Sequence, residues 1–211
     1  MTASPWADPA IARAMRENVD RQLAEVPWPV HFRAFADAVM SVGYGRLRGR
    51  VLEIGCGVGH GVAILDRAGI PYDEYSGVDL NRDAVAIASE RYPNATFAEA
   101  EFGAYIAATV VNDYDVVVDG SCVLHVEDWR AHLGYLCGAS RDAVILHRLP
   151  IHFDERATTS PTSTTGYGHE FPAWRFALHE VQDEMHKLGF SNTEARRADG
   201  DSLTLTFRKG K

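Results

Sequence analysis

A short apolar run that leads directly into a glycine-rich loop is the feature that most constrains how this chain folds. Residues 51–61 read VLEIGCGVGHG, and a helical pattern continues to Gly69. Glycine permits positive φ and lets a ligand approach bare backbone, while the N-terminus of the next helix offers free N–H groups to a polar or anionic ligand. The sequence therefore predicts a strand, a ligand-binding turn and a helix in succession.

The alternation of strand-like and helix-like segments continues beyond this loop. Five strand-like runs precede residue 150, at 50–55, 74–80, 95–100, 114–120 and 142–149. The helical segments between them are 59–69, 81–92, 102–111 and 128–140. This order indicates βαβ units and a parallel sheet with helices on both faces. Two further runs flank Asp199-Gly200 between 190 and 209, which predicts a C-terminal antiparallel hairpin.

Different patterns flank this core. Residues 8–26 carry apolar side chains at four-residue spacing, with Asp8 as the N-cap and Pro9 as the first helical residue. A second helix is expected over 30–43. Residues 153–172 are rich in Thr, Ser, Gly and Pro, which predicts a long mobile loop, and a helix is expected over 170–189. We therefore expect an N-terminal helical cap at 1–45, a main domain at 46–211 and a lid loop at about 153–172.

Composition excludes several functions. A length of 211 residues suits one domain, and 21 Lys and Arg against 29 Asp and Glu give a net charge of −8. No basic face for nucleic acid is expected from that balance. No apolar stretch is long enough to span a bilayer, and no secretory signal or metal-ligand spacing is evident. Three cysteines form no even framework, so a reduced, cytoplasmic location is expected.

The spacing of the glycines excludes two common classes of nucleotide-binding loop. From either Gly55 or Gly57 the dinucleotide pattern GxGxxG fails at its last position, and no Gly-Lys-Ser/Thr follows to make a P-loop. Asp79 ends the second strand, where doubly wound nucleotide folds bind ribose hydroxyls. A nucleoside-containing ligand other than a nicotinamide dinucleotide is therefore expected, although Asp79 as a plain helix cap is the alternative.

These features together resemble the class I S-adenosylmethionine-dependent methyltransferases. The resemblance rests on ExGxGxG after the first strand, Asp79 after the second, DVVV in the fourth, and the terminal hairpin, and it covers about residues 48–211. It implies a three-layer, Rossmann-like doubly wound α/β sheet of seven strands, mostly parallel, with a C-terminal antiparallel hairpin. It also implies S-adenosylmethionine as cofactor and S-adenosylhomocysteine as product.

The resemblance assigns cofactor roles residue by residue. Asp79 would bind both ribose hydroxyls and Leu80 would pack on the adenine. Glu101, where the family usually has Asp, would accept a hydrogen bond from the adenine amino group. The implied cofactor-binding residues are Glu53, Gly55, Cys56, Gly57, Gly59, Asp79, Leu80, Glu101, Phe102, Asp119, Gly120 and Ser121.

The acceptor side carries no motif, so its assignments are hypotheses. We expect a small-molecule acceptor, methylated on O, N or C, above the fourth and fifth strands, with His147 or His125 as general base. Arg148 could hold an acidic group of the acceptor or be an ordinary exposed arginine, and Trp28 and Trp174 are candidate pocket walls. The alternatives are an inactive regulatory or scaffold subunit and, less favoured by the glycine spacing, a nicotinamide dehydrogenase. The sequence identifies neither the acceptor nor the oligomeric state.

Overall fold

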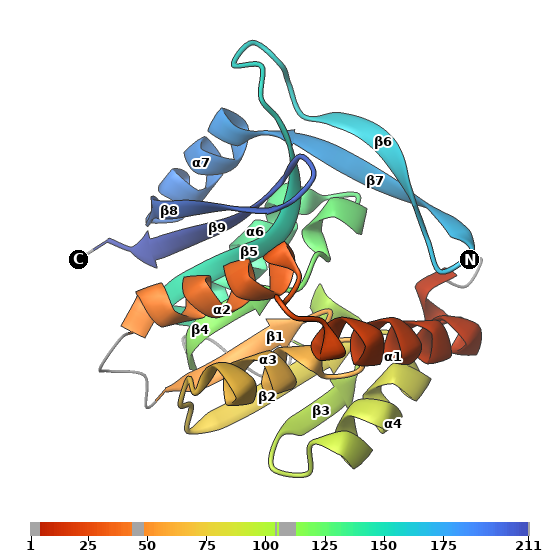
Figure 1. Ribbon diagram of the computed structural model, residues 1–211. Coiled ribbons are helices and arrows are strands. Elements are labelled where there is room, and N and C mark those ends of the chain that lie inside the picture. Colours follow the sequence, from red (N-terminus) through yellow and green to blue (C-terminus); the bar gives the residue numbers. More distant parts are fainter. Residues whose placement is uncertain (1–4, 44–48, 104, 106–112, 211) are drawn as a thin grey trace.

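The computed structural model describes residues 5–43, 49–103, 105 and 113–210 (Figure 1). The helices are η1 (Pro5–Ala7), α1 (Pro9–Ala24), α2 (Val30–Gly43), α3 (His60–Ala68), α4 (Arg82–Arg91), η2 (Val123–His125), α6 (Trp129–Ala139) and α7 (Leu178–Lys187). The strands are β1 (Arg50–Ile54), β2 (Glu74–Asp79), β3 (Thr96–Glu99), β4 (Tyr114–Asp119), β5 (Ser140–His152), β6 (Ser160–Gly166), β7 (His169–Ala177), β8 (Phe190–Asp199) and β9 (Ser202–Lys209). Most of the helix expected over 102–111 lies outside the described residues.

Seven of the strands form the sheet that the sequence predicts. Strands β3, β2, β1, β4 and β5 lie side by side in that order and run parallel. Strand β9 pairs antiparallel with β5, and β8 pairs antiparallel with β9. The carboxyl ends of the parallel strands therefore meet at one edge of the sheet, where ligands bind in doubly wound folds. The predicted α/β fold with a C-terminal antiparallel hairpin is confirmed.

Alternating side chains of the strands build a core on each face of this sheet. Val51 in β1 and Val116 in β4 pack with α2 and α3 on one face. Leu52 in β1 and Val117 in β4 pack with α6 and α7 on the other. The architecture is thus three layers, helices–sheet–helices (Figure 1). None of the described helices is both long enough and apolar enough to cross a bilayer.

Strands β6 and β7 correct two sequence expectations. The segment expected to be a loop over 153–172 contains an antiparallel hairpin, paired from Ser160 with Arg175 to Gly166 with His169. The helix expected from 170 begins only at Leu178. The reason is a period of two, because Phe171 and Ala173 are buried in β7 while the intervening side chain is exposed. The hairpin follows β5 in the chain, and Phe171 of β7 contacts Trp6 of η1. Figure 1 shows the hairpin extending away from the main sheet.

The first helix forms as expected and covers the glycine-rich loop. Asp8 caps α1 by accepting from the Ala10 N–H at 2.8 Å, with Pro9 as the first helical residue. Buried Ala12 and Val19 of α1 form a small core with Val58 and α4. Helix α1 therefore packs over the loop between β1 and α3.

Candidate cofactor and acceptor site

The loop after β1 folds tightly onto the ends of β2 and β4. Gly55, Gly57 and Gly59 have φ angles of 73°, 52° and 77°, which L side chains rarely adopt. The N–H of Gly55 donates to the Val78 carbonyl at 2.8 Å. A Cβ atom at Gly55 would collide with the Cys122 sulfur. Glycine is thus required both by the backbone conformation and by the close approach of β4.

Asp79 lies where β2 ends and faces this loop. Its Oδ2 accepts from the Gly57 N–H at 2.8 Å, and its Oδ1 accepts from the Asn81 N–H at 2.8 Å. Burial raises the pKa of Asp79, and these backbone donors oppose the shift by stabilising the carboxylate. Each carboxylate oxygen has a further lone pair. Asp79 also lines the cavity, so its carboxylate can accept a hydrogen bond from a ligand there.

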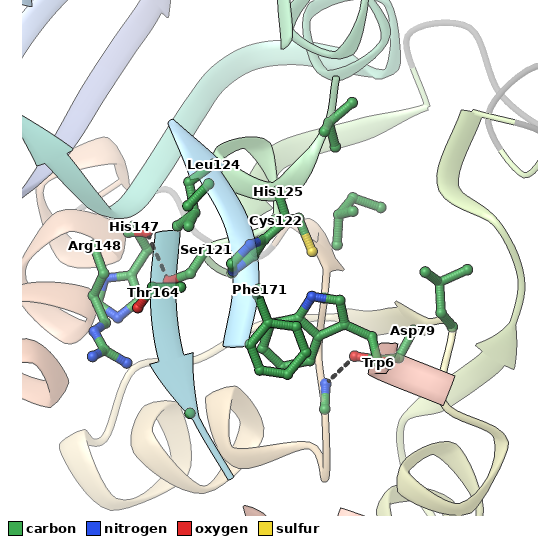
Figure 2. Close-up of a pocket in the computed structure, with 18 of the residues that line it drawn as sticks. Trp6, Asp79, Ser121, Cys122, Leu124, His125, His147, Arg148, Thr164 and Phe171 are labelled. Carbon is green, nitrogen blue, oxygen red and sulfur yellow. Dashed lines mark hydrogen bonds between the residues drawn. The ribbon is translucent and has the colours of Figure 1, made fainter. Parts of the chain in front are cut away.

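A cavity of about 1130 Å³ runs from the glycine-rich loop to the ends of β5 and β8. Eight of the expected cofactor-binding residues and both expected bases line it (Figure 2). The eight are Gly55, Gly57, Asp79, Leu80, Glu101, Phe102, Gly120 and Ser121. The structure therefore brings most of the expected site together, in one space shared with the candidate bases His125 and His147.

Glu53 lies behind this lining rather than in it. The side chain is fully buried; its Oε2 accepts from the Tyr75 hydroxyl, and its Oε1 has no hydrogen-bond partner. Burial is the main cause of a pKa raised to about 7. Gly120 lies beside Oε1 and does line the cavity. Glu53 is therefore separated from the cavity by Gly120, and its expected role in cofactor binding stays a prediction.

Three other expected residues also lie outside the lining. The Cys56 side chain is buried beneath the loop, near Gly77. A Cβ at Gly59 would stand 2.9 Å from the Tyr92 ring, so packing against α4 explains that glycine. Asp119 accepts from the Cys122 N–H at 2.8 Å and contacts His132 Nε2 at 2.6 Å. Its fully buried carboxylate caps η2 and does not face the cavity.

The hydrogen bond made by His125 determines which of its ring nitrogens carries the proton. Its Nδ1 lies 2.9 Å from the Pro172 carbonyl, which can only accept, so Nδ1 carries the proton. Burial lowers the pKa of His125. The ring of Trp6 lies beside it, with centroids 4.9 Å apart (Figure 2). In the neutral ring Nε2 is therefore an acceptor, as a general base requires.

His147 belongs to a group of three histidines that line the cavity. Its Nδ1 pairs with Thr204 Oγ1 at 2.9 Å, which leaves Nε2 for a ligand. Desolvation lowers the pKa of His147 well below its usual value and brings those of His31 and His60 to about 4. All three rings are consequently uncharged near neutral pH.

Sequence reasoning missed the residues that close the cavity. Trp6 of η1 stacks on Phe171 of β7 with centroids 3.9 Å apart, and His31 comes from α2 (Figure 2). None of these has a local motif. Trp174 lines the cavity as expected, whereas Trp28 does not and instead has the Arg67 guanidinium over its ring at 5.0 Å.

The fold and the cavity define an α/β domain with a ligand-binding cavity at the carboxyl ends of its parallel strands. Residues 52–139 match a family model described as a methyltransferase domain. A search of curated protein sequences found no match.

Three solved structures show the same fold at low sequence identity. The 1,6-didemethyltoxoflavin-N1-methyltransferase of Burkholderia thailandensis, bound to S-adenosylhomocysteine, is 15% identical with a TM-score of 0.66, covering 100% of this chain and 94% of that one. The magnesium protoporphyrin IX methyltransferase of Synechocystis, bound to S-adenosylmethionine, is 14% identical with a TM-score of 0.65, covering 99% and 100%. The N-methyltransferase NodS of Bradyrhizobium japonicum, bound to S-adenosylhomocysteine, is 16% identical with a TM-score of 0.61, covering 97% and 100%. Together they confirm the Rossmann-like α/β fold predicted from the sequence, and the matched domain agrees with the predicted class of enzyme.

Proposed function

We propose that this protein transfers a methyl group from S-adenosylmethionine to a small-molecule acceptor bound in the same cavity. The observation that carries the proposal is the continuity of that cavity, from Gly57 and Asp79 at one end to His147 at the other. Structural neighbours named for toxoflavin and porphyrin substrates support a small acceptor. The net charge of −8 argues against a nucleic acid acceptor.

The residues at the first end suit the cofactor. Gly55 and Gly57 line the cavity beside Asp79, whose carboxylate is the charged acceptor that we assign to the ribose hydroxyls. The unpartnered Glu53 Oε1 behind Gly120 is a buried acceptor on the same side. We assign the expected contacts of Leu80, Glu101 and Phe102 to the adenosine. When bound, the cofactor supplies a methyl group on a positively charged sulfur.

Positioning is the main contribution that this chain's residues make. Holding two reactants at attack geometry can lower a barrier by roughly 7–11 kcal/mol. Helix α1 and the β6–β7 hairpin cover the cavity, and the stacked pair of Trp6 and Phe171 joins the two covers. Water is thereby excluded from the reacting atoms. We assign the cap to residues 1–45, the main domain to 46–211, and the lid to the hairpin-containing segment at about 153–172.

A general base is needed only for an acceptor that loses a proton. His125 suits this role because the Pro172 carbonyl fixes its proton on Nδ1 and burial keeps the ring neutral. His147 is the second candidate. A base of this kind contributes about 10²–10⁴-fold. Replacing each by Ala should lower kcat without weakening S-adenosylhomocysteine binding, and unchanged kcat in both variants would leave positioning as the whole mechanism.

Calorimetry with S-adenosylhomocysteine tests the function directly. We expect the wild-type protein to bind it and D79N to bind at least about tenfold more weakly, because two ligand hydroxyls lose a charged acceptor. D83N is the matched control. It removes the same charge, and Asp83 is exposed in the first turn of α4. Absence of binding to the wild-type protein would favour the alternative, an inactive regulatory or scaffold subunit. The cytoplasmic location stays a prediction.

A further inference from the structure

Backbone strain is concentrated around the cavity. Among the described residues, three non-glycine residues have positive φ: Ser121 at 69°, Arg148 at 57° and Tyr167 at 52°. All three line the cavity, although Ser121 follows β4, Arg148 lies within β5 and Tyr167 lies in the turn between β6 and β7. Such conformations are unfavourable for L side chains and persist where the surrounding structure imposes them, often at ligand sites. The strain at Arg148 directs attention to the acceptor end.

Arg148 lies in an irregularity of β5 that changes where its side chain points. Leu146 pairs with Leu205 and Leu149 with Leu203, so β5 carries one residue more than β9 across this interval. A bulge of this kind re-aims side chains and is frequent beside active sites. The Ser121 hydroxyl donates to the His147 carbonyl at 3.1 Å and ties the bulge to the end of β4 (Figure 2).

The two acidic side chains on the cavity wall at this end are each paired with an arginine. The Arg148 guanidinium pairs with Asp199 at 3.1 Å, and the other nearby acid, Asp201, pairs with Arg175. The positive charge of Arg148 adds to burial, the larger cause, in lowering the pKa values of His31, His60 and His147. His60 Nδ1 is buried and has no partner among the described residues.

We propose that the acceptor carries a carboxylate and that Arg148, presented by the β5 bulge, binds it. The proposal rests on the proposed function, because it names the class of acceptor for the same cavity. A guanidinium has five N–H donors, and its contact with one Asp199 oxygen leaves several for a ligand. Arg148 and Asp199 are also partly exposed, so a ligand can compete with the pair at little cost.

The surroundings favour an anion over a cation or an uncharged acceptor. A cation would be repelled by Arg148. The two carboxylates that could attract it, Asp199 and Asp201, are already paired with arginines. An uncharged acceptor would need neither the guanidinium nor the strained backbone that positions it. A carboxylate would gain charge-assisted hydrogen bonds from the N–H groups of Arg148.

The test compares matched acids and amides on protein saturated with S-adenosylhomocysteine. Benzoate, 4-hydroxybenzoate and 2-aminobenzoate are titrated by calorimetry beside the corresponding amides, for wild type, R148Q and R141Q. Arg141 is the matched control because it lies on the same strand at the end opposite the cavity. It also pairs with an acid, Asp113, at 3.3 Å and has a similar side-chain exposure, 50% against 45%.

The expected result is that at least one acid binds about tenfold more tightly than its amide to wild type and R141Q, and that R148Q abolishes the preference. The proposal is overturned if no acid binds, if the amides bind equally well, or if R141Q loses the preference as R148Q does. S-adenosylhomocysteine affinity, measured first, separates the two levels. Failure of the wild type to bind it refutes the proposed function, whereas intact binding without acid preference refutes only the carboxylate assignment.

Discussion

Replacing Glu53 by Gln should remove a pH-dependent loss of stability. The buried carboxyl has its pKa raised from 4.5 to about 7, mainly by desolvation. A group with a raised pKa in the folded state favours folding fully below its unfolded pKa, and that contribution is lost as pH rises through the folded value. A shift from 4.5 to about 7 corresponds to about 3 kcal/mol. Gln keeps the size of the protonated acid, and its carbonyl can still accept from the Tyr75 hydroxyl.

Urea unfolding of the ligand-free protein at pH 5 and pH 8 measures this effect. We expect wild type and E53Q to have similar free energies of unfolding at pH 5, and E53Q to be the more stable at pH 8, by up to about 3 kcal/mol. E90Q is the control, because Glu90 is exposed on α4 and the same substitution removes no buried charge. If wild type and E53Q instead run parallel across this range, Glu53 is not held in a desolvated site and the reasoning fails.

The remaining predictions concern the loop and the two covers of the cavity. G55A should destabilise the protein by at least about 2 kcal/mol, because the added Cβ meets the Cys122 sulfur and the residue has a positive φ. The control is G134A in α6, whose added Cβ meets no atom within 4 Å and should not destabilise the protein. Thermal melts of both variants test this difference. W6A should leave the melting temperature within a few degrees of wild type but raise the acceptor KM, since it removes the stack on Phe171 that joins the covers. An unchanged KM in W6A would show that the stack has no part in acceptor binding.

The sheet could be predicted from the sequence because its determinants are local. Most of the parallel strands are short apolar runs. Two of the helices that follow have a capping side chain at their start: Asn81 accepts from the Asp83 and Ala84 N–H groups, and Asp128 accepts from the Ala131 N–H. The terminal hairpin was predictable from its Asp-Gly turn. The β6–β7 hairpin was missed because Thr, Ser and Gly in 160–168 match a loop composition as well as an exposed strand. Only burial of Phe171 in β7 distinguishes the two.

Most of the residues that line the cofactor end of the cavity could also be predicted from the sequence. The expected residues that do not line it include two buried carboxylates. Gly57 and Asp79 lie in one motif and at one strand end, so their meeting follows from the βαβ topology. Glu53 in β1 and Asp119 at the end of β4 also lie near this edge of the sheet. Their side chains, however, are fully buried. Which carboxylate faces the ligand depends on the pleat of each strand and on contacts with Tyr75 or His132, and a residue pattern does not encode these.

The two ends of the cavity are therefore under different structural control. The cofactor end is built by consecutive elements around a single loop, so its chemistry is fixed wherever this fold forms. The acceptor end takes Trp6 from η1, His31 from α2, Arg148 from the β5 bulge and Phe171 from an inserted hairpin, and these segments lie far apart in the chain. Replacing one of these four side chains changes the acceptor end and leaves the backbone donors to Asp79 in place. Variants at the acceptor end should accordingly alter substrate preference while S-adenosylhomocysteine affinity stays constant, and a variant such as R148Q that weakened both together would show that the two ends are coupled.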